Sequence, residues 1–264
     1  MRENKVQSLW KRGEAVLNGW LTLPSSWTAE VMANQGWDSL TIDMQHGLMD
    51  YQTAFGMLQA ISTTSTTPLV RVNWNEPGSI MKVLDAGAYG VICPMINSRA
   101  ECEAFVGACR YHPRGYRSAG PTRATVYAGR DYETYANQTV ITLAMIETRQ
   151  AMDNLDEIMS VPGLDGVYVG PNDLSLSMDL PERANLTEAH MVPLLEKIVA
   201  ATKRHGIQAG IHTRSAVDGR LMIEKGFTFV TVNSDTALLT SAASSVIKAV
   251  RPEHAASPEP KAMD

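Results

Sequence analysis

The chain has 264 residues, of which 44% are apolar and 19% charged, so it can bury a large core and is too hydrophobic for a disordered linker. Its 23 basic and 28 acidic residues give a net charge of −5 with no cluster of Lys and Arg, which argues against a nucleic-acid partner. We see no apolar leader and no apolar run that could cross a bilayer, so we expect a soluble, cytoplasmic protein without a membrane partner. The three cysteines include no C-x-x-C pair.

Eight short apolar runs follow one another along the chain, and most are continuous rather than alternating, as expected of parallel strands buried on both faces. They cover residues 19–23, 39–44, 68–72, 90–95, 141–147, 166–170, 208–213 and 227–233. The segments between them have helical periodicity, with start signals at Ser98 and Ser215 and helix-ending glycines at Gly87, Gly206 and Gly226. This alternation predicts a single (β/α)8 TIM barrel, an α/β fold, over residues 1–252.

An open doubly wound sheet is the alternative, but no G-x-G-x-x-G or G-x-x-x-x-G-K-[ST] sequence follows any run.

Two segments lie outside the repeat. Residues 110–137 form a connection too long for an ordinary loop, and we expect a lid, a subunit contact or an extra helix there. Residues 253–264 are polar and contain proline, which predicts a disordered C-terminal tail.

Catalytic groups of a (β/α)8 barrel lie at the C-terminal ends of its strands, where the loops converge on one mouth. Polar residues stand at five of these ends: Asp43, Gln45, His46, Arg71, Glu147, Asn172, Asp173 and His212. Bulky polar groups cannot face a barrel core without partners, so we expect these side chains to surround the mouth. For His212, filling the barrel is an equally good interpretation.

Glu147 and Asp173 form the most informative pair, because two carboxylates from adjacent strands can share a divalent cation and leave other positions to water and substrate. Ligation by oxygen alone favours Mg²⁺ or Mn²⁺ over structural zinc. The alternative is two solvated loop acids, with Asp173 suited to the start of a helix. The spacing of the two residues does not decide between these interpretations.

Three further residues carry candidate roles. His46 follows Asp43, an arrangement in which a carboxylate orients an imidazole for proton transfer, although a lone loop histidine is often only a surface residue. Arg71 ends a buried strand and needs an anion, such as a substrate carboxylate or a developing enolate. Asp85 lies near the end of a helix, where the dipole disfavours an anion, so we expect a cationic or histidine partner.

Two absences narrow the chemistry. A Schiff-base aldolase would need a lysine on a strand, but five lysines fall in helical segments and none of them ends a run: Lys82, Lys197, Lys203, Lys225 and Lys248. The last two strand-to-helix loops lack the glycines that usually hold a phosphate. We therefore expect a metal-dependent reaction on an unphosphorylated substrate.

From about residue 19 to about residue 251 the sequence resembles the class II, metal-dependent pyruvate aldolases typified by 4-hydroxy-2-oxoheptanedioate aldolase, in the aldolase and citrate lyase superfamily. The resemblance rests on several short segments taken together. They are residues 42–46 (IDMQH), 70–72 (VRV), 81–88 (MKVLDAGA), 94–95 (PM), 111–115 (YHPRG), 145–148 (MIET) and 166–175 (GVYVGPNDLS).

The resemblance implies an aldolase that cleaves 4-hydroxy-2-oxo acids reversibly to pyruvate or hydroxypyruvate and an aldehyde. It assigns the divalent metal to Glu147 and Asp173, with Mg²⁺ or Mn²⁺ expected and Co²⁺ or Zn²⁺ as alternatives. His46 would be the base, tuned by Asp43 and Asp85, and Arg71 would stabilise the enolate. It also implies a homohexamer in which neighbouring barrels exchange helices.

Departures from the family pattern fall beside the implied metal and base. Met145 stands where the family often has a substrate-contacting Gln, Gln45 replaces Glu before the histidine, and Asn172 replaces a small residue before the metal-binding Asp. Met145, Asn172 and Asp173 are therefore candidate substrate contacts. Arg117 and Arg123 are candidates for an acceptor carboxylate or ordinary loop arginines.

Oxaloacetate decarboxylation or a citrate-lyase-type cleavage, both of which use the same enolate chemistry, is the alternative reaction. A non-catalytic barrel that serves as a binding module is the alternative from another class. The complete set of charged residues at the strand ends disfavours a binding module, because buried charge is costly to keep without a use.

Overall fold

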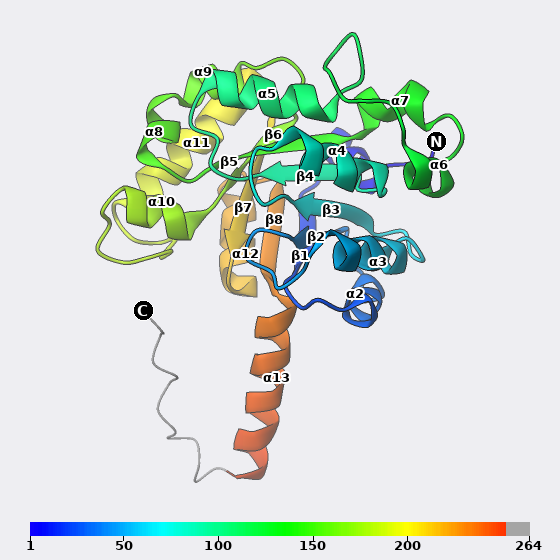
Figure 1. Ribbon diagram of the computed structural model, residues 1–264. Coiled ribbons are helices and arrows are strands. Elements are labelled where there is room, and N and C mark those ends of the chain that lie inside the picture. The colour runs from blue at the N-terminus through cyan, green and yellow to red at the C-terminus, as the bar shows by residue number, and fades with distance from the viewer. Residues whose placement is uncertain (252–264) are drawn as a thin grey trace.

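The eight apolar runs form parallel strands that close into a barrel in chain order, with β1 paired to β8 (Figure 1). The computed structural model describes residues 1–251, so the predicted tail over residues 253–264 lies outside the described part of the chain. The strands are β1 (Val16–Leu21), β2 (Ser39–Asp43), β3 (Thr67–Arg71), β4 (Gly90–Cys93), β5 (Ile141–Ile146), β6 (Gly166–Val169), β7 (Gln208–Thr213) and β8 (Phe229–Ser234). The predicted (β/α)8 barrel is confirmed.

Most of the helices surround the barrel and connect its strands. They are α1 (Lys5–Lys11), α2 (Ser26–Ala33), α3 (Tyr51–Ile61), α4 (Pro77–Asp85), α5 (Arg99–Cys109), α6 (Thr122–Ala128), α7 (Tyr132–Thr139), α8 (Arg149–Asp153), α9 (Leu155–Met159), α10 (Pro171–Ser177), α11 (Met191–His205), α12 (Ala216–Glu224) and α13 (Asp235–Val250). Ser98 and Ser215 cap α5 and α12 through their side-chain oxygens, as predicted. Gly87, Gly206 and Gly226 follow α4, α11 and α12 with φ of +104°, +67° and +100°, which favours glycine.

The first strand begins earlier than the sequence indicates, at Val16 instead of Gly19. Leu17 interrupts the buried pattern because its side chain points outward and stays 43% exposed. Gly19 permits close packing inside the sheet, since a Cβ there would lie 2.6 Å from Cδ2 of Leu40. The run from Gly19 therefore misses the first three residues of the strand, of which Val16 and Asn18 are buried.

The extra segment between α5 and β5 contains helices, one of the three outcomes expected for residues 110–137. Its helices α6 and α7 enclose a small aromatic cluster with Tyr89, Tyr111 and Tyr132. Tyr89 immediately precedes β4, so this cluster lies toward the N-terminal end of the strand, opposite the mouth. The segment thus covers the barrel away from the strand ends that carry the candidate residues.

The last helix, α13, projects away from the barrel instead of packing against it (Figure 1). Asp235 fixes its start, since its carboxylate accepts hydrogen bonds from the main-chain N–H groups of Thr22 (2.8 Å) and Leu23 (3.1 Å). Leu239 and Ile247 on this helix are about 60% exposed, at 62% and 58%. In residues 1–251 no helix has both the length and the apolarity that a bilayer crossing requires.

Candidate active site

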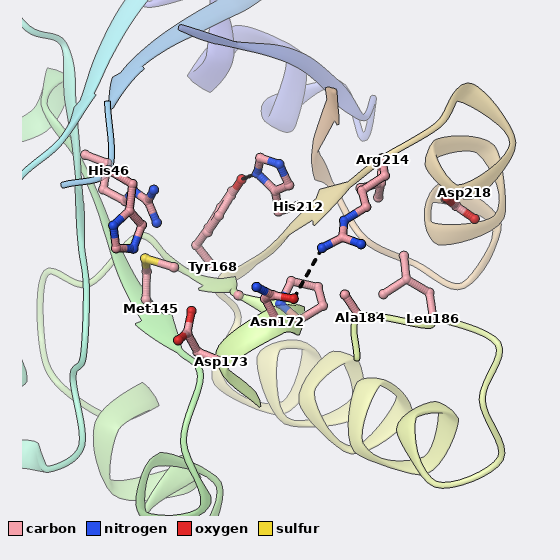
Figure 2. A pocket seen from close by; sticks show the side chains of 14 residues that line it. His46, Met145, Tyr168, Asn172, Asp173, Ala184, Leu186, His212, Arg214 and Asp218 are labelled. Atoms are coloured by element: carbon pink, nitrogen blue, oxygen red, sulfur yellow. Dashed lines mark hydrogen bonds between the residues drawn. The ribbon is translucent and has the colours of Figure 1, made fainter. Parts of the chain in front are cut away.

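A pocket of about 290 Å³ lies at the C-terminal ends of the strands. Figure 2 shows His46, Met145, Asn172 and Asp173 around it, together with Arg214 from the loop after β7. Arg71, the last residue of β3, also lines this pocket. Because parallel strands end on one side of the barrel, residues far apart in the sequence converge here. The structure therefore brings together most of the candidate site residues.

Asp43 and Arg71 form a buried ion pair at the bottom of the pocket. Nε and Nη2 of Arg71 donate to the two carboxylate oxygens of Asp43, at 2.8 and 2.6 Å, and the guanidinium lies over the Trp20 ring. Burial opposes the charge on Asp43, but the hydrogen bonds and positive charge of Arg71 lower the pKa of its carboxyl overall. The anion that Arg71 requires is thus Asp43, and its Nη1 forms no hydrogen bond within the described chain.

Asp43 contacts the main chain of His46 and not its ring, which corrects the expected carboxylate–imidazole pair. Its Oδ1 accepts hydrogen bonds from the N–H groups of Gln45 (3.1 Å) and His46 (3.3 Å), while Trp20 Nε1 donates to Oδ2 at 3.1 Å. The carboxylate oxygens are occupied by these donors and Arg71. Asp43 therefore shapes the turn that carries His46, whose imidazole lines the pocket without a hydrogen bond in residues 1–251.

Glu147 lies just behind the pocket and is 2% exposed. Its Oε1 accepts a hydrogen bond from the N–H of Met95 at 2.7 Å, and Met95 adopts a left-handed φ of +56° to present that group. Burial raises the pKa of Glu147 to about 7, and the nearby negative charge of Asp173 acts in the same direction. A positive charge placed beside this carboxyl would therefore stabilise its ionised form.

The space beside Glu147 and Asp173 suits a hard divalent cation. A Cβ at Gly170 would lie 2.5 Å from Glu147 Oε2, so the glycine leaves that oxygen accessible. The described residues contain no group of three His, Cys, Asp or Glu side chains arranged to hold a metal. Two carboxylates would leave most coordination positions of a divalent cation to water and substrate oxygens.

The structure does not bring Asp85 to the mouth. Asp85 is the last residue of α4, and its Oδ1 accepts a 2.6 Å hydrogen bond from Nη2 of the buried Arg117. This is the cationic partner expected from its position, but no contact within the described chain joins Asp85 to His46. Arg123 donates to the carbonyl of Ala86 at 2.6 Å, where it caps the end of α4. Arg117 and Arg123 are therefore structural contacts here, not pocket residues.

Tyr168 and Arg214 line the pocket although the sequence does not predict them, and His212 joins them there. The Tyr168 hydroxyl lies 3.1 Å from Nδ1 of His212 (Figure 2) and donates to Thr231 Oγ1 at 2.7 Å. Burial, with the positive charge of Arg71, lowers the pKa of His212 to about 4. Arg214 donates to Oδ1 of Asn172 at 3.2 Å. The one feature of the sequence that could have identified Arg214 is its position just after the strand that ends at His212.

Known proteins resemble this chain in sequence and in fold. Residues 18–242 match the family described as HpcH/HpaI aldolase/citrate lyase. The chain is 43% identical to a hydroxypyruvate/pyruvate aldolase of Rhizorhabdus wittichii, over 94% of this chain and 99% of that protein. It is 36% identical to a 4-hydroxy-2-oxo-heptane-1,7-dioate aldolase of Escherichia coli, over 91% and 92%. A crystal structure of an HpcH/HpaI family protein from Burkholderia cenocepacia superposes with a TM-score of 0.87 at 30% identity, covering 94% and 99% of the two chains.

Proposed function

Because the chain belongs to the HpcH/HpaI aldolase/citrate lyase family, we propose that it cleaves 4-hydroxy-2-oxo acids reversibly to an aldehyde and pyruvate or hydroxypyruvate. The proposal is carried by one observation: His46, Arg71 and Asp173 line the same pocket, with Glu147 directly behind it. A carbon–carbon lyase needs a base for the hydroxyl proton and positive charge for the departing electron pair. The pocket supplies a candidate for each requirement.

We propose that Glu147 and Asp173 hold a divalent metal, Mg²⁺ or Mn²⁺ in preference to Co²⁺ or Zn²⁺. When bound, this ion supplies Lewis acidity to the 2-oxo group. His46 takes the proton of the C4 hydroxyl, and the C3–C4 bond breaks as C4 becomes the aldehyde carbonyl. The electron pair of that bond forms the C2=C3 bond of an enolate, whose C2 oxygen takes the negative charge, and the protonated His46 then returns its proton to C3. Arg71 donates a hydrogen bond from Nη1 to the oxygen on which the negative charge develops. Met145 and Asn172 contact the bound acid from the wall of the pocket.

The function is tested by removing and restoring the metal. We expect chelated protein to be inactive, and protein reloaded with Mg²⁺ or Mn²⁺ to release pyruvate from a panel of 4-hydroxy-2-oxo acids without CO₂. A coupled assay for pyruvate and a CO₂ electrode measure both products. Activity that survives chelation would remove the metal from the proposal. Carbon dioxide released from oxaloacetate alone would favour a decarboxylase.

We expect metal affinity to rise with pH up to about pH 7 and then to level off. The raised pKa means that Glu147 keeps a proton below this value, and a metal ligand must lose its proton to bind. Each pH unit below 7 should therefore weaken binding by about tenfold. Calorimetric titration of Mn²⁺ between pH 5.5 and 8.5 measures the slope. Glu147→Gln should bind Mn²⁺ much more weakly and without this pH dependence, whereas an affinity independent of pH in the unaltered protein would contradict the assignment.

Arg71→Lys should be damaging although it keeps the positive charge. An ammonium cannot donate to both oxygens of Asp43 and also to the reacting oxygen, because it lacks the planar fork of a guanidinium. We expect turnover at saturating substrate to fall by about 10²-fold, the scale for losing one preorganised donor. Steady-state kinetics with a thermal unfolding control measures this. Turnover close to that of the unaltered enzyme would limit Arg71 to a structural role.

We further propose that the protein is a homo-oligomer, a hexamer by resemblance, in which α13 packs on a second copy. The helix exposes Leu239 and Ile247. On the barrel, Leu17 of β1 and Trp27 of α2 are exposed as well, so both the helix and the barrel offer apolar side chains for a contact between copies. Replacing both helix residues by Glu should yield smaller species, because the charges would be buried in the contact. Light scattering after gel filtration measures the mass, and an unchanged mass would exclude this contact.

A further inference from the structure

The pocket extends past the residues proposed for the chemistry and ends at Arg214. Figure 2 shows Asn172 between Asp173 and Arg214, with Ala184 and Leu186 along the same side. Ala184 and Leu186 come from the segment between α10 and α11 and offer an aliphatic wall. The two ends of the pocket thus differ in chemistry: one end carries Asp173, His46 and the ion-paired Arg71, and the other carries Arg214.

Arg214 has unused hydrogen-bonding capacity. It forms a single hydrogen bond within the described chain, to the neutral amide oxygen of Asn172, and no ion pair within 4.0 Å. A guanidinium has five N–H donors in a planar fork that matches the two oxygens of a carboxylate. By contrast, Arg71 is paired with Asp43 and Arg117 with Asp85. Within residues 1–251, Arg214 is therefore the pocket arginine without a carboxylate partner.

The acidic residues of the pocket do not neutralise Arg214. Asp218 lines the same end, but its Oδ2 accepts a 2.7 Å hydrogen bond from Ser215 and it stands in the first turn of α12, where the helix dipole favours its charge. Asp173 lies on the other side of Asn172, beside Glu147, where a metal would offset its charge. A ligand that fills the pocket from Asp173 outward would bring its far end to Arg214.

On the basis of the proposed aldolase function, we propose that Arg214 forms a carboxylate subsite that selects acidic acceptor aldehydes. The donor acid occupies the end at Glu147 and Asp173, the aliphatic part of the acceptor lies along Ala184 and Leu186, and its terminal carboxylate accepts two hydrogen bonds from Arg214. This is the task that the sequence suggests for Arg117 and Arg123. The structure places both of those arginines in contacts with α4 and makes Arg214 the candidate instead.

The test compares 4-oxobutanoate with its uncharged methyl ester as acceptors for pyruvate. Arg214→Gln should lower kcat/KM for the acid by about 10- to 100-fold, as expected for a charged bidentate contact, and leave the value for the ester and the KM for pyruvate nearly unchanged. Arg214→Lys should have a kcat/KM for the acid between the values of the unaltered enzyme and Arg214→Gln, because lysine keeps the positive charge but lacks the planar fork of a guanidinium. Arg220→Gln is the matched control, since it removes an exposed arginine from α12 outside the pocket.

Equal losses for the acid and the ester, or a loss seen mainly in the KM for pyruvate, would overturn the assignment. A second measurement does not require turnover: calorimetric titration of succinate into the metal-free protein. Succinate should bind to the unaltered protein and to Arg220→Gln, and binding should be lost in Arg214→Gln. Binding that is unchanged in Arg214→Gln, or absent from the unaltered protein, overturns the subsite even where aldolase activity is present. If succinate binds through Arg214 but no acceptor reacts, the aldolase proposal fails and the anion site stands.

Discussion

Glu147→Gln should reduce metal-dependent turnover by about 10³-fold or more while leaving the barrel folded. The amide occupies the same volume and can still accept the hydrogen bond from Met95, but it removes the negative charge that the divalent ion requires. Metal titration and steady-state kinetics on the same preparation measure the two losses together. Asp173→Asn should behave in the same way, because the proposed ion depends on both carboxylates.

The stability of the same variant separates a binding role from a structural one. Because the pKa of Glu147 is raised in the folded state, the protonated carboxyl stabilises the fold at low pH. This stabilisation is lost as pH rises through about 7, where the folded protein must carry the disfavoured charge. At pH 8 the metal-free Gln variant should therefore unfold at a temperature no lower than the unaltered protein. Glu103→Gln makes the same chemical change on the exposed surface of α5 and serves as the control. A Glu147→Gln protein with normal turnover would reject the metal assignment.

The sequence is sufficient for the architecture and for the side of the barrel that carries the site. Continuous apolar runs mark strands buried on both faces, and in a closed parallel barrel every strand end points to one mouth. This is why the sequence alone places His46, Arg71 and Asp173 in one group. Their individual roles remain predictions, because position at a strand end does not specify what a side chain binds.

Pairings between distant residues are not encoded in any local pattern. The sequence predicts that Asp43 orients the His46 ring, but the strand register sets Asp43 opposite Arg71, whose fork takes both carboxylate oxygens. Asp85 is predicted to have a cationic partner, and the fold of the segment before α6 identifies that partner as Arg117. The position of Arg214 likewise depends on how the loop after β7 turns over Asn172.

His46→Ala should lower turnover by about 10²–10⁴-fold, the range for loss of a general base, and leave the KM for pyruvate nearly unchanged. The pocket contains a second imidazole, His212, but its lowered pKa of about 4 leaves it a weak base and its Nδ1 is engaged with Tyr168. Added imidazole should restore part of the activity, because truncation leaves space at a residue that lines the pocket. His190→Ala removes an exposed histidine and is the control. Steady-state rates with and without imidazole measure this. An unaltered rate in His46→Ala, or a loss seen only in KM, would reassign the base. If imidazole restores activity to His46→Ala but not to Glu147→Gln, proton transfer and metal binding are lost separately in the two variants.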